Sequence, residues 1–172
     1  MKKTCSLVAV FLVIFLCSAG CTRKEVPRTI KEYPLNSADV ITKTNVSFDP
    51  AVSFDGKGSV RIDAPGNMVV NLYEVSDADV DNSRLVYRAK VKTKDVEGKV
   101  FLEMRCVFRG KGEYFSRGLD TYLAGTNDWT TQETPFFLKK GQKPEIIKLN
   151  LVITGGGTVW IDDAQLIRGP LK

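Results

Sequence analysis

Apolar and polar side chains alternate with a period of two along much of this chain, and no other feature of the sequence restricts its fold as strongly. Residues 99–108 place Val, Leu, Met, Cys and Phe at every second position, and residues 85–93 repeat the pattern with Leu, Tyr, Ala and Val. Successive side chains of a β-strand point to opposite faces, so each run predicts a strand with one buried face. No long stretch shows the apolar spacing of an amphipathic helix.

Turn-forming residues separate these runs and divide the chain into short strands. Gly, Pro, Asn and charged residues form turn signals at residues 55–56, 65–67, 97–98, 110–112, 140–141 and 155–157. Between them we expect further strands over residues 58–63, 68–75, 113–119, 134–138, 146–154 and 158–167. Short strands at this spacing predict an all-β fold, an antiparallel β-sandwich or jelly roll, over residues 38–172.

The first residues have the composition of an export signal. Lys2 and Lys3 give a positive start, and residues 7–17 then run without a charge. An apolar run of about 7–15 residues behind a basic start is typical of a signal peptide. A membrane-spanning helix needs about 20 apolar residues, which is more than this run offers. We therefore expect residues 1–20 to form a cleavable signal peptide.

Small residues follow the apolar run and end at a cysteine, in the order Ser18, Ala19, Gly20 and Cys21. This segment resembles the lipobox of bacterial lipoproteins, although that family most often has Leu where Ser18 stands. The resemblance implies cleavage before Cys21, a diacylglycerol on its thiol, and a cell-envelope protein held on a membrane by its N-terminal lipid. Thr22 replaces the Asp that commonly retains such proteins in the inner membrane, which implies the outer membrane in a Gram-negative host.

Residues 21–37 are expected to form the lipidated N-terminus and a short tether ahead of the domain. They hold charges, two prolines and few apolar side chains, a composition that favours an exposed linker. The alternative is an ordered extension that packs on the domain, which Tyr33 and Leu35 could support.

The cysteines, the absence of histidine and the charge exclude several classes of protein. Of the four cysteines, Cys5 and Cys17 lie in the signal and Cys21 in the lipobox, which leaves Cys106 without a disulfide partner. Its apolar neighbours predict a small buried strand residue. The lack of histidine removes the commonest general base and most zinc sites. The net charge of +5 comes from interspersed acids and bases, which does not indicate a partner nucleic acid.

The C-terminal half carries a second family resemblance in three segments, NDWT at 127–130, PFFL at 135–138 and GTVWIDDAQL at 157–166. With the strand-like runs at 58–62 and 87–93, they resemble galactose-binding-domain-like jelly rolls, in particular carbohydrate-binding-module-like domains. The resemblance implies the fold over roughly residues 45–168. It says little about the ligand, because this fold hosts many functions.

The two tryptophans of the sequence lie in these segments, and we expect both to be structural. Trp160 falls within a predicted strand, which favours a buried position over a ligand platform. Trp129 follows a turn and is expected to cover an edge of the sandwich.

A structural calcium ion is common in the family that the chain resembles, where it joins the N-terminal strands to the last strand. Calcium takes about six to eight oxygen ligands from carboxylates and carbonyls. Adjacent residues on a strand point to opposite faces, so only one of Asp162 and Asp163 is expected to reach the ion. The alternative is a set of turn and edge carboxylates without an ion. The resemblance implies ligands among Asp49, Asp55, Ser59, Asp162 and Asp163, with Asp63 as a weaker candidate.

A charged strand face is the candidate binding surface, provided that its strands neighbour one another. Aromatic residues for sugar stacking are few, with Phe101 in phase and Tyr114, Phe115 and Tyr122 as a possible rim. A charged face suits an acidic glycan, peptidoglycan or an acidic protein surface. The alternative is an ordinary solvated sheet face. The candidate ligand-binding residues are Arg88, Lys90, Glu103, Arg105, Lys148 and Asn150.

These observations favour a protein that binds rather than one that catalyses. Glu103 can be paired on paper with Asp120, Asp128 or Glu133 as acid and base, but no spacing supports such a pair. We therefore expect a non-catalytic envelope protein that binds a carbohydrate or glycan. The alternative is an assembly lipoprotein that recruits a protein partner.

Overall fold

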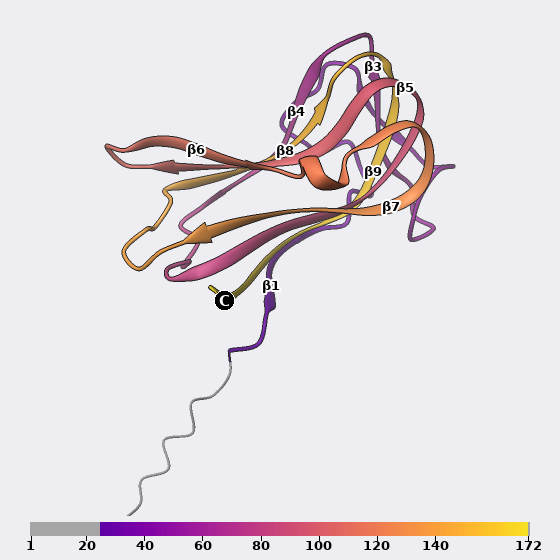
Figure 1. Ribbon diagram of the computed structural model, residues 1–172. Helices are drawn as coiled ribbons and strands as arrows, with labels where there is room; N and C mark the ends of the chain where they lie inside the picture. The colour runs from indigo at the N-terminus through magenta and orange to yellow at the C-terminus, as the bar shows by residue number, and fades with distance from the viewer. Residues whose placement is uncertain (1–24, 172) are drawn as a thin grey trace, which may run out of the picture.

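The computed structural model describes residues 25–171, so the predicted signal peptide and Cys21 lie outside the described residues. Nine strands account for most of this part of the chain (Figure 1). Its helical element is one short 3-10 turn, η1 (Leu119–Thr121), and no helix among the described residues is long and apolar enough to cross a membrane. The strands are β1 (Arg28–Tyr33), β2 (Val46–Asp49), β3 (Ser59–Ala64), β4 (Met68–Ser76), β5 (Ser83–Phe108), β6 (Gly112–Arg117), β7 (Leu123–Leu138), β8 (Ile146–Ile153) and β9 (Gly157–Pro170).

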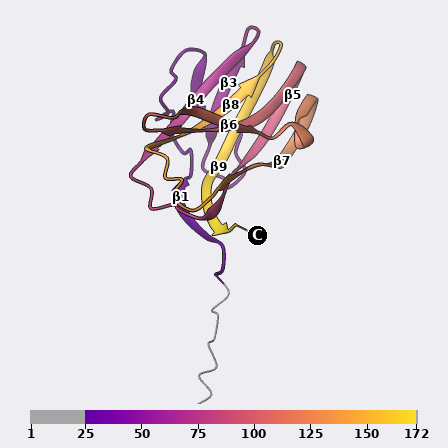
Figure 2. The same cartoon turned by 60° about the vertical axis from the view of Figure 1, so that its left-hand side comes forward.

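Strand β5 is long enough to belong to both layers of a sandwich. Its first half pairs with β9 on one side and β7 on the other, and its second half pairs with β8 and β6. The first layer therefore has the order β2-β3-β9-β5-β7, with β1 added to the far end of β9. The second layer has the order β4-β8-β5-β6, and every pairing is antiparallel. Figures 1 and 2 show the two layers joined through β5.

The predicted alternation places the core between the layers. Tyr87 and Val91 from the first half of β5 and Leu102 and Met104 from its second half are fully buried in one hydrophobic cluster. The residues that alternate with these four therefore point out of the sandwich. Those in the first half of β5 lie on the outer surface of the first layer, and those in its second half lie on the outer surface of the second layer. The structure confirms an all-β antiparallel sandwich.

The chain changes layer around residues 95–99. Asp95 takes a positive φ of 54°, and the pairing of β5 with β7 shifts register on both sides of Val96. Here β5 runs close to the turn between β8 and β9, where Glu97 N donates to Gly156 O and Lys99 N donates to Thr154 O. Such irregularities bend a strand and increase its twist, which lets one strand serve two sheets.

Much of the predicted tether is part of the domain. Strand β1 pairs with β9 from Arg28 opposite Arg168 to Tyr33 opposite Ala164. The ring of Tyr33 stacks on that of Tyr73 with centroids 3.7 Å apart, and Leu35 is buried in the core. The ordered extension that we kept as an alternative therefore describes residues 28–35, and only the residues before β1 are left to link the domain to Cys21.

A polar face on the second layer

Four neighbouring strands present polar side chains on the outer surface of the second layer. Asn71 of β4, Asn150 of β8 and Glu103 of β5 lie opposite one another across the sheet. In the next row, Lys148 lies opposite Arg105. Strand β6 extends this surface on the other side of β5. Its Arg117 pairs with Glu103 in the first row, and its Glu113 pairs with Val107 in the row beyond Arg105. We call the polar face the surface formed by Asn71, Glu103, Arg105, Glu113, Arg117, Lys148 and Asn150.

Glu103 lies at the centre of the polar face, and its side chain is buried. Its Oε1 accepts hydrogen bonds from Arg105 Nε at 2.6 Å and Asn150 Nδ2 at 3.1 Å, and its Oε2 accepts from Arg117 Nε at 2.6 Å. Short bonds between charged groups are the stronger class of hydrogen bond. The carboxylate therefore fixes the two guanidinium groups and the amide in one arrangement.

The same contacts decide the ionisation of Glu103. Burial raises the pKa of a carboxyl group, but here the hydrogen bonds from Arg105, Arg117 and Asn150 outweigh burial and the pKa of Glu103 is lowered. Glu103 is consequently a charged anchor at neutral pH and does not carry a proton to donate.

Glu113 extends the network toward the open end of β6. Its carboxylate forms ion pairs with Arg105 Nη1 at 3.4 Å and with Lys148 Nζ at 3.2 Å. The guanidinium of Arg117 lies 4.3 Å from the centre of the Phe115 ring, which is 57% exposed. Positive and negative groups thus neutralise one another across most of the polar face.

Two buried amide oxygens on the polar face have no hydrogen-bond partner. Asn150 is only 4% exposed, and its Nδ2 is used by Glu103 while its Oδ1 is unpaired. Asn71 lies directly opposite; its Nδ2 donates to Glu74, and its Oδ1 is also unpaired. An unpaired buried acceptor is unfavourable unless a ligand or water supplies a donor. Both oxygens have less than 1 Å² of accessible surface, so a donor reaches them only when neighbouring side chains move.

One end of the polar face is apolar. Phe101 and Val152 lie opposite each other one row beyond Glu103 and Asn150, and Val69 next to them is 52% exposed. Beyond the strands, Tyr122 is 44% exposed, and the ammonium of Lys99 lies 4.5 Å from the centre of its ring. The polar face therefore lies near two exposed aromatic rings, those of Phe115 and Tyr122. Such a surface is suited to a ligand with both hydroxyl groups and apolar faces.

The structure brings together four of the six predicted ligand-binding residues, Glu103, Arg105, Lys148 and Asn150. Arg88 and Lys90 belong to the first half of β5 and point outward from the first layer. There Arg88 pairs with Glu133 at 2.6 Å, and Lys90 donates to Thr131 Oγ1 at 2.8 Å.

Sequence reasoning missed Asn71, Glu113 and Arg117. Glu113 and Arg117 fall in the phase that faces outward if residues 99–117 form a hairpin around the turn at 110–112, and this signal was available. No sequence signal pointed to Asn71, because its neighbour Asn150 lies far along the chain.

The predicted calcium ligands are mostly engaged with the loop that precedes β3. Asp49 accepts Trp160 Nε1 at 2.9 Å and the backbone N–H groups of residues 51 and 52, while Ser59 Oγ donates to the carbonyl of residue 52 at 2.6 Å. Asp163 accepts from Gln165. Within residues 25–171, no group of three or more His, Cys, Asp or Glu side chains is arranged to hold a metal.

Asp162 is a predicted ligand whose carboxylate is buried and already accepts hydrogen bonds from the backbone. It is fully buried, and burial raises its pKa, with a further rise from the negative charge of Asp55. Two backbone N–H groups, from Phe54 and Asp163, donate to it at 2.8 Å and offset part of this effect. Any ion here would need carbonyl oxygens for most of its ligands, so structural calcium stays a prediction.

Trp160 and Cys106 are buried, whereas Trp129 is half-buried. Trp160 is 7% exposed, lies under the loop before β3 and has Arg61 over its ring at 5.5 Å. Trp129 contacts Phe54 edge to face, with centroids 6.2 Å apart, on the outside of the first layer. Cys106 is buried in the core, and burial raises its pKa to about 12. Such a thiol is protonated at neutral pH and poorly reactive.

The carboxylates considered as a catalytic pair do not act on one another. Glu103 is held by two arginines, while Asp128 pairs with Lys92 and Glu133 with Arg88 on the outside of the first layer. Asp120, the third partner considered, lies apart from these pairs, beside Arg117 in a hollow next to β6.

Comparison with known proteins identifies the fold. No protein-family model matches the sequence, and no curated protein sequence matches it. Among solved structures, the chain is similar to the CBM22-1 xylan-binding domain of Paenibacillus barcinonensis Xyn10C, with 12% identity, 87% of this chain and 88% of that chain covered, and a TM-score of 0.57. A family 16 carbohydrate-binding module matches with 13% identity, 71% and 84% coverage, and a TM-score of 0.52.

An α-L-arabinofuranosidase is also similar, with 13% identity and a TM-score of 0.51, but the match covers 75% of this chain and 22% of that chain. The described domain therefore has the jelly-roll β-sandwich fold of carbohydrate-binding modules, which confirms the resemblance seen in the sequence.

Proposed function

We propose that this chain is a lipid-anchored envelope protein whose polar face binds a glycan without catalysis. The observation that carries the proposal is the row of polar side chains across β6, β5, β8 and β4, in which Glu103 fixes two guanidinium groups and an amide. Sugar hydroxyls both donate and accept, so a sugar unit lying on this row can receive hydrogen bonds from the arginines and donate to the glutamates. The fold supports this proposal, because two similar structures are carbohydrate-binding modules.

The charges of the polar face favour a neutral glycan over the acidic one suggested by the sequence. Arg105, Arg117 and Lys148 are each within ion-pair distance of Glu103 or Glu113. A ligand carboxylate would have to compete with these two glutamates, whereas hydroxyl groups need not. Binding should therefore depend only weakly on salt concentration.

Titration calorimetry of the soluble domain against soluble polysaccharides tests the proposal. Hits from a glycan array would be titrated with wild type and with Asn150→Ala and Arg105→Ala. Each substitution should weaken binding by about tenfold, the effect of losing hydrogen bonds worth roughly 1.4 kcal/mol. Lys90→Ala and Trp129→Ala, on the outside of the first layer, are matched controls and should bind as wild type does. Loss of binding in the controls, or no binding to any glycan, would contradict the proposal.

A further inference from the structure

The edge of β6 is unpaired along the lateral opening of the sandwich. Among the described strands, β6 pairs with β5 alone. Gly118 N donates to Leu102 O, and an antiparallel ladder bonds every second residue. The backbone N–H and C=O groups of Glu113, Phe115 and Arg117 therefore point away from β5. An edge of this kind is a template for another extended chain.

β6 and β7 are joined at one point and diverge from it. Ser116 Oγ is 2.8 Å from Thr134 Oγ1 and donates to Pro135 O. Beyond this contact, β6 runs out to the β5–β6 turn and β7 to the β7–β8 loop, and Figure 1 shows the two strands separating. We call the wedge the space between these two strands that the two hollows described next occupy, with Ser116 at its closed end.

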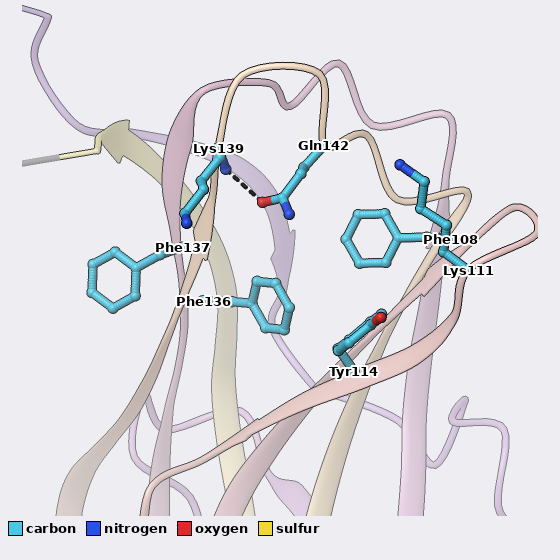
Figure 3. A pocket seen from close by; sticks show the side chains of 7 residues that line it. All are labelled: Phe108, Lys111, Tyr114, Phe136, Phe137, Lys139 and Gln142. Carbon is cyan, nitrogen blue, oxygen red and sulfur yellow. Dashed lines mark hydrogen bonds between the residues drawn. The ribbon is translucent and has the colours of Figure 1, made fainter.

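Two hollows open into this wedge. The first, of about 270 Å³, is lined mainly by aromatic rings, with Phe108 at its inner wall and Tyr114, Phe136 and Phe137 around it (Figure 3). The second is lined by Phe115, Arg117, Asp120 and Pro135 and shares Phe136 and Phe137 with the first. Tyr114 and Phe115 are consecutive on β6 and point to opposite faces, so the hollows lie on opposite sides of the β6 edge.

The aromatic side chains of the wedge are more exposed than the core they adjoin. Tyr114, Phe115 and Phe137 are 55%, 57% and 54% exposed, although Phe108 behind them is 9% exposed and packs edge to face on Tyr114 at 5.8 Å. Grouped exposed aromatic residues commonly mark an interaction surface. Gln142 Oε1 at the rim of the first hollow accepts a hydrogen bond from Lys139 N at 2.7 Å.

Two lysines stand at the mouth of the first hollow. Figure 3 shows Lys111 and Lys139 on either side of it, from the β5–β6 turn and the end of β7. Neither forms an ion pair with any residue between 25 and 171. Unpaired cations beside an apolar hollow complement an acidic residue next to an apolar anchor.

We propose that the wedge binds an extended segment of a partner protein, which adds as a strand to β6. Its backbone pairs with Glu113 and Phe115 on the open side of Ser116, and its side chains alternate between the two hollows, as in other cases of strand addition. An aromatic or large aliphatic side chain fills the hollow between Phe108 and Phe136, and an acidic residue beside it faces Lys111 and Lys139. This site borders the polar face along β6, but it does not rest on the glycan proposal.

Selection from a displayed library of random peptides, with the soluble domain as bait, tests the proposal. The enriched peptides should share a large apolar anchor with an acidic neighbour. Tyr114→Glu should weaken them by about tenfold or more, because it puts a charge beside the anchor. Lys111→Gln with Lys139→Gln should remove the salt dependence of binding.

Two controls separate this site from the polar face. Asn150→Ala should keep peptide binding and weaken glycan binding about tenfold, and Tyr114→Glu should weaken peptide binding and keep glycan binding. Amide hydrogen exchange with bound peptide should show new protection at Glu113 and Phe115. The proposal is overturned if no common motif is enriched, if Tyr114→Glu binds the peptides as wild type does, or if protection appears elsewhere. A dimer of the free domain that Tyr114→Glu dissociates would also overturn it, since a second copy would then occupy the edge.

Discussion

Burying a carboxylate is unfavourable unless its negative charge is paired and its oxygens receive hydrogen bonds. Glu103 meets both conditions through Arg105, Arg117 and Asn150, and these partners tie strands β5, β6 and β8 together. The network therefore supports the polar face and also contributes to the stability of the second layer.

Glu103→Gln should destabilise the domain by about 1.5–3 kcal/mol, the range for hydrogen bonds to charged groups. The amide keeps the shape of the side chain but turns a nitrogen toward an arginine donor. Urea unfolding of both proteins measures the difference. Glu133→Gln, which breaks an ion pair with both side chains more than 40% exposed, is the matched control and should cost less than about 1 kcal/mol. Equal losses in the two variants would show that Glu103 has no special role.

The pH dependence of this loss follows from the lowered pKa of Glu103. A carboxyl group with a lower pKa in the folded state stabilises the fold above its unfolded pKa, about 4.3 for Glu. That contribution disappears as the pH falls through the folded pKa. The free-energy difference between wild type and Glu103→Gln should thus be constant near neutral pH and shrink below about pH 4. A difference that persists unchanged in acid would contradict the hydrogen-bonded arrangement at Glu103.

Asp162 has the opposite shift, because burial and Asp55 raise its pKa. A bound cation would relieve this unfavourable charge, so millimolar calcium should raise the thermal midpoint of chelator-treated wild type. Asp162→Ala should lower the midpoint and remove the response to calcium. Asp63→Ala tests a residue that already pairs with Arg61 at 2.8 Å, and its response should match that of wild type. An unchanged wild-type midpoint would rule out the structural ion.

At the scale of elements, the passage of β5 from one layer to the other depends on a close approach at Gly98. A Cβ added there would lie 2.0 Å from Thr154 O, which is a backbone atom and cannot move aside cheaply. Gly98→Ala should therefore cost about 3 kcal/mol or more, at the upper end of the usual range for single substitutions. Gly66→Ala is the control, since a Cβ there meets nothing within 4 Å. Chemical denaturation compares the two, and similar midpoints would contradict the described crossing.

The sequence predicted strands better than it predicted their neighbours. Period-two alternation is local, so it located residues 85–93 and 99–108 and their outward side chains. It could not show that the two runs form one strand in two layers, which puts Lys90 and Arg105 on opposite outer surfaces. The pairing of Asn71 with Asn150 was equally hidden, because it depends on contacts between residues distant in the chain.

The calcium prediction shows the same limit at the level of single residues. The family resemblance implied acidic ligands near the last strand, but hydrogen bonds decide which of them are free. Asp49 is held by the Trp160 indole, and Asp163 sits at a positive φ of 46° where the pairing of β5 with β9 is irregular. Neither fact can be read from residue types.

Considered as a whole, the molecule places its two candidate surfaces on different parts of the sandwich. The polar face covers the outside of the second layer and the wedge lies between β6 and β7, whereas β1 enters beside the end of β9 (Figure 1). The end of β7 that borders the wedge lies at the same end of the first layer as β1, because Leu138 and Pro170 both pair with Ser83 and Arg28 pairs with Arg168.

The proposed anchor can be tested on the full chain. Cys21→Ser removes the thiol that the lipobox resemblance assigns to the lipid, so the protein should move from the membrane fraction to the soluble fraction. Ser18→Leu, which restores the residue most common in lipoboxes, should stay with the membrane and serves as the control. Membrane retention of Cys21→Ser would contradict lipid attachment at this residue.

The position of β1 also determines how the domain responds to pulling. A load applied at the N-terminus enters the fold at Arg28, opposite Arg168, and acts first on the hydrogen bonds between β1 and the end of β9. Release of residues 28–35 would add about 26–29 Å of extended chain at roughly 3.3–3.6 Å per residue, while β3, β5 and β9 keep their own pairings. Detachment of β1 would thus lengthen the link to the domain while the strands that carry the candidate surfaces stay paired.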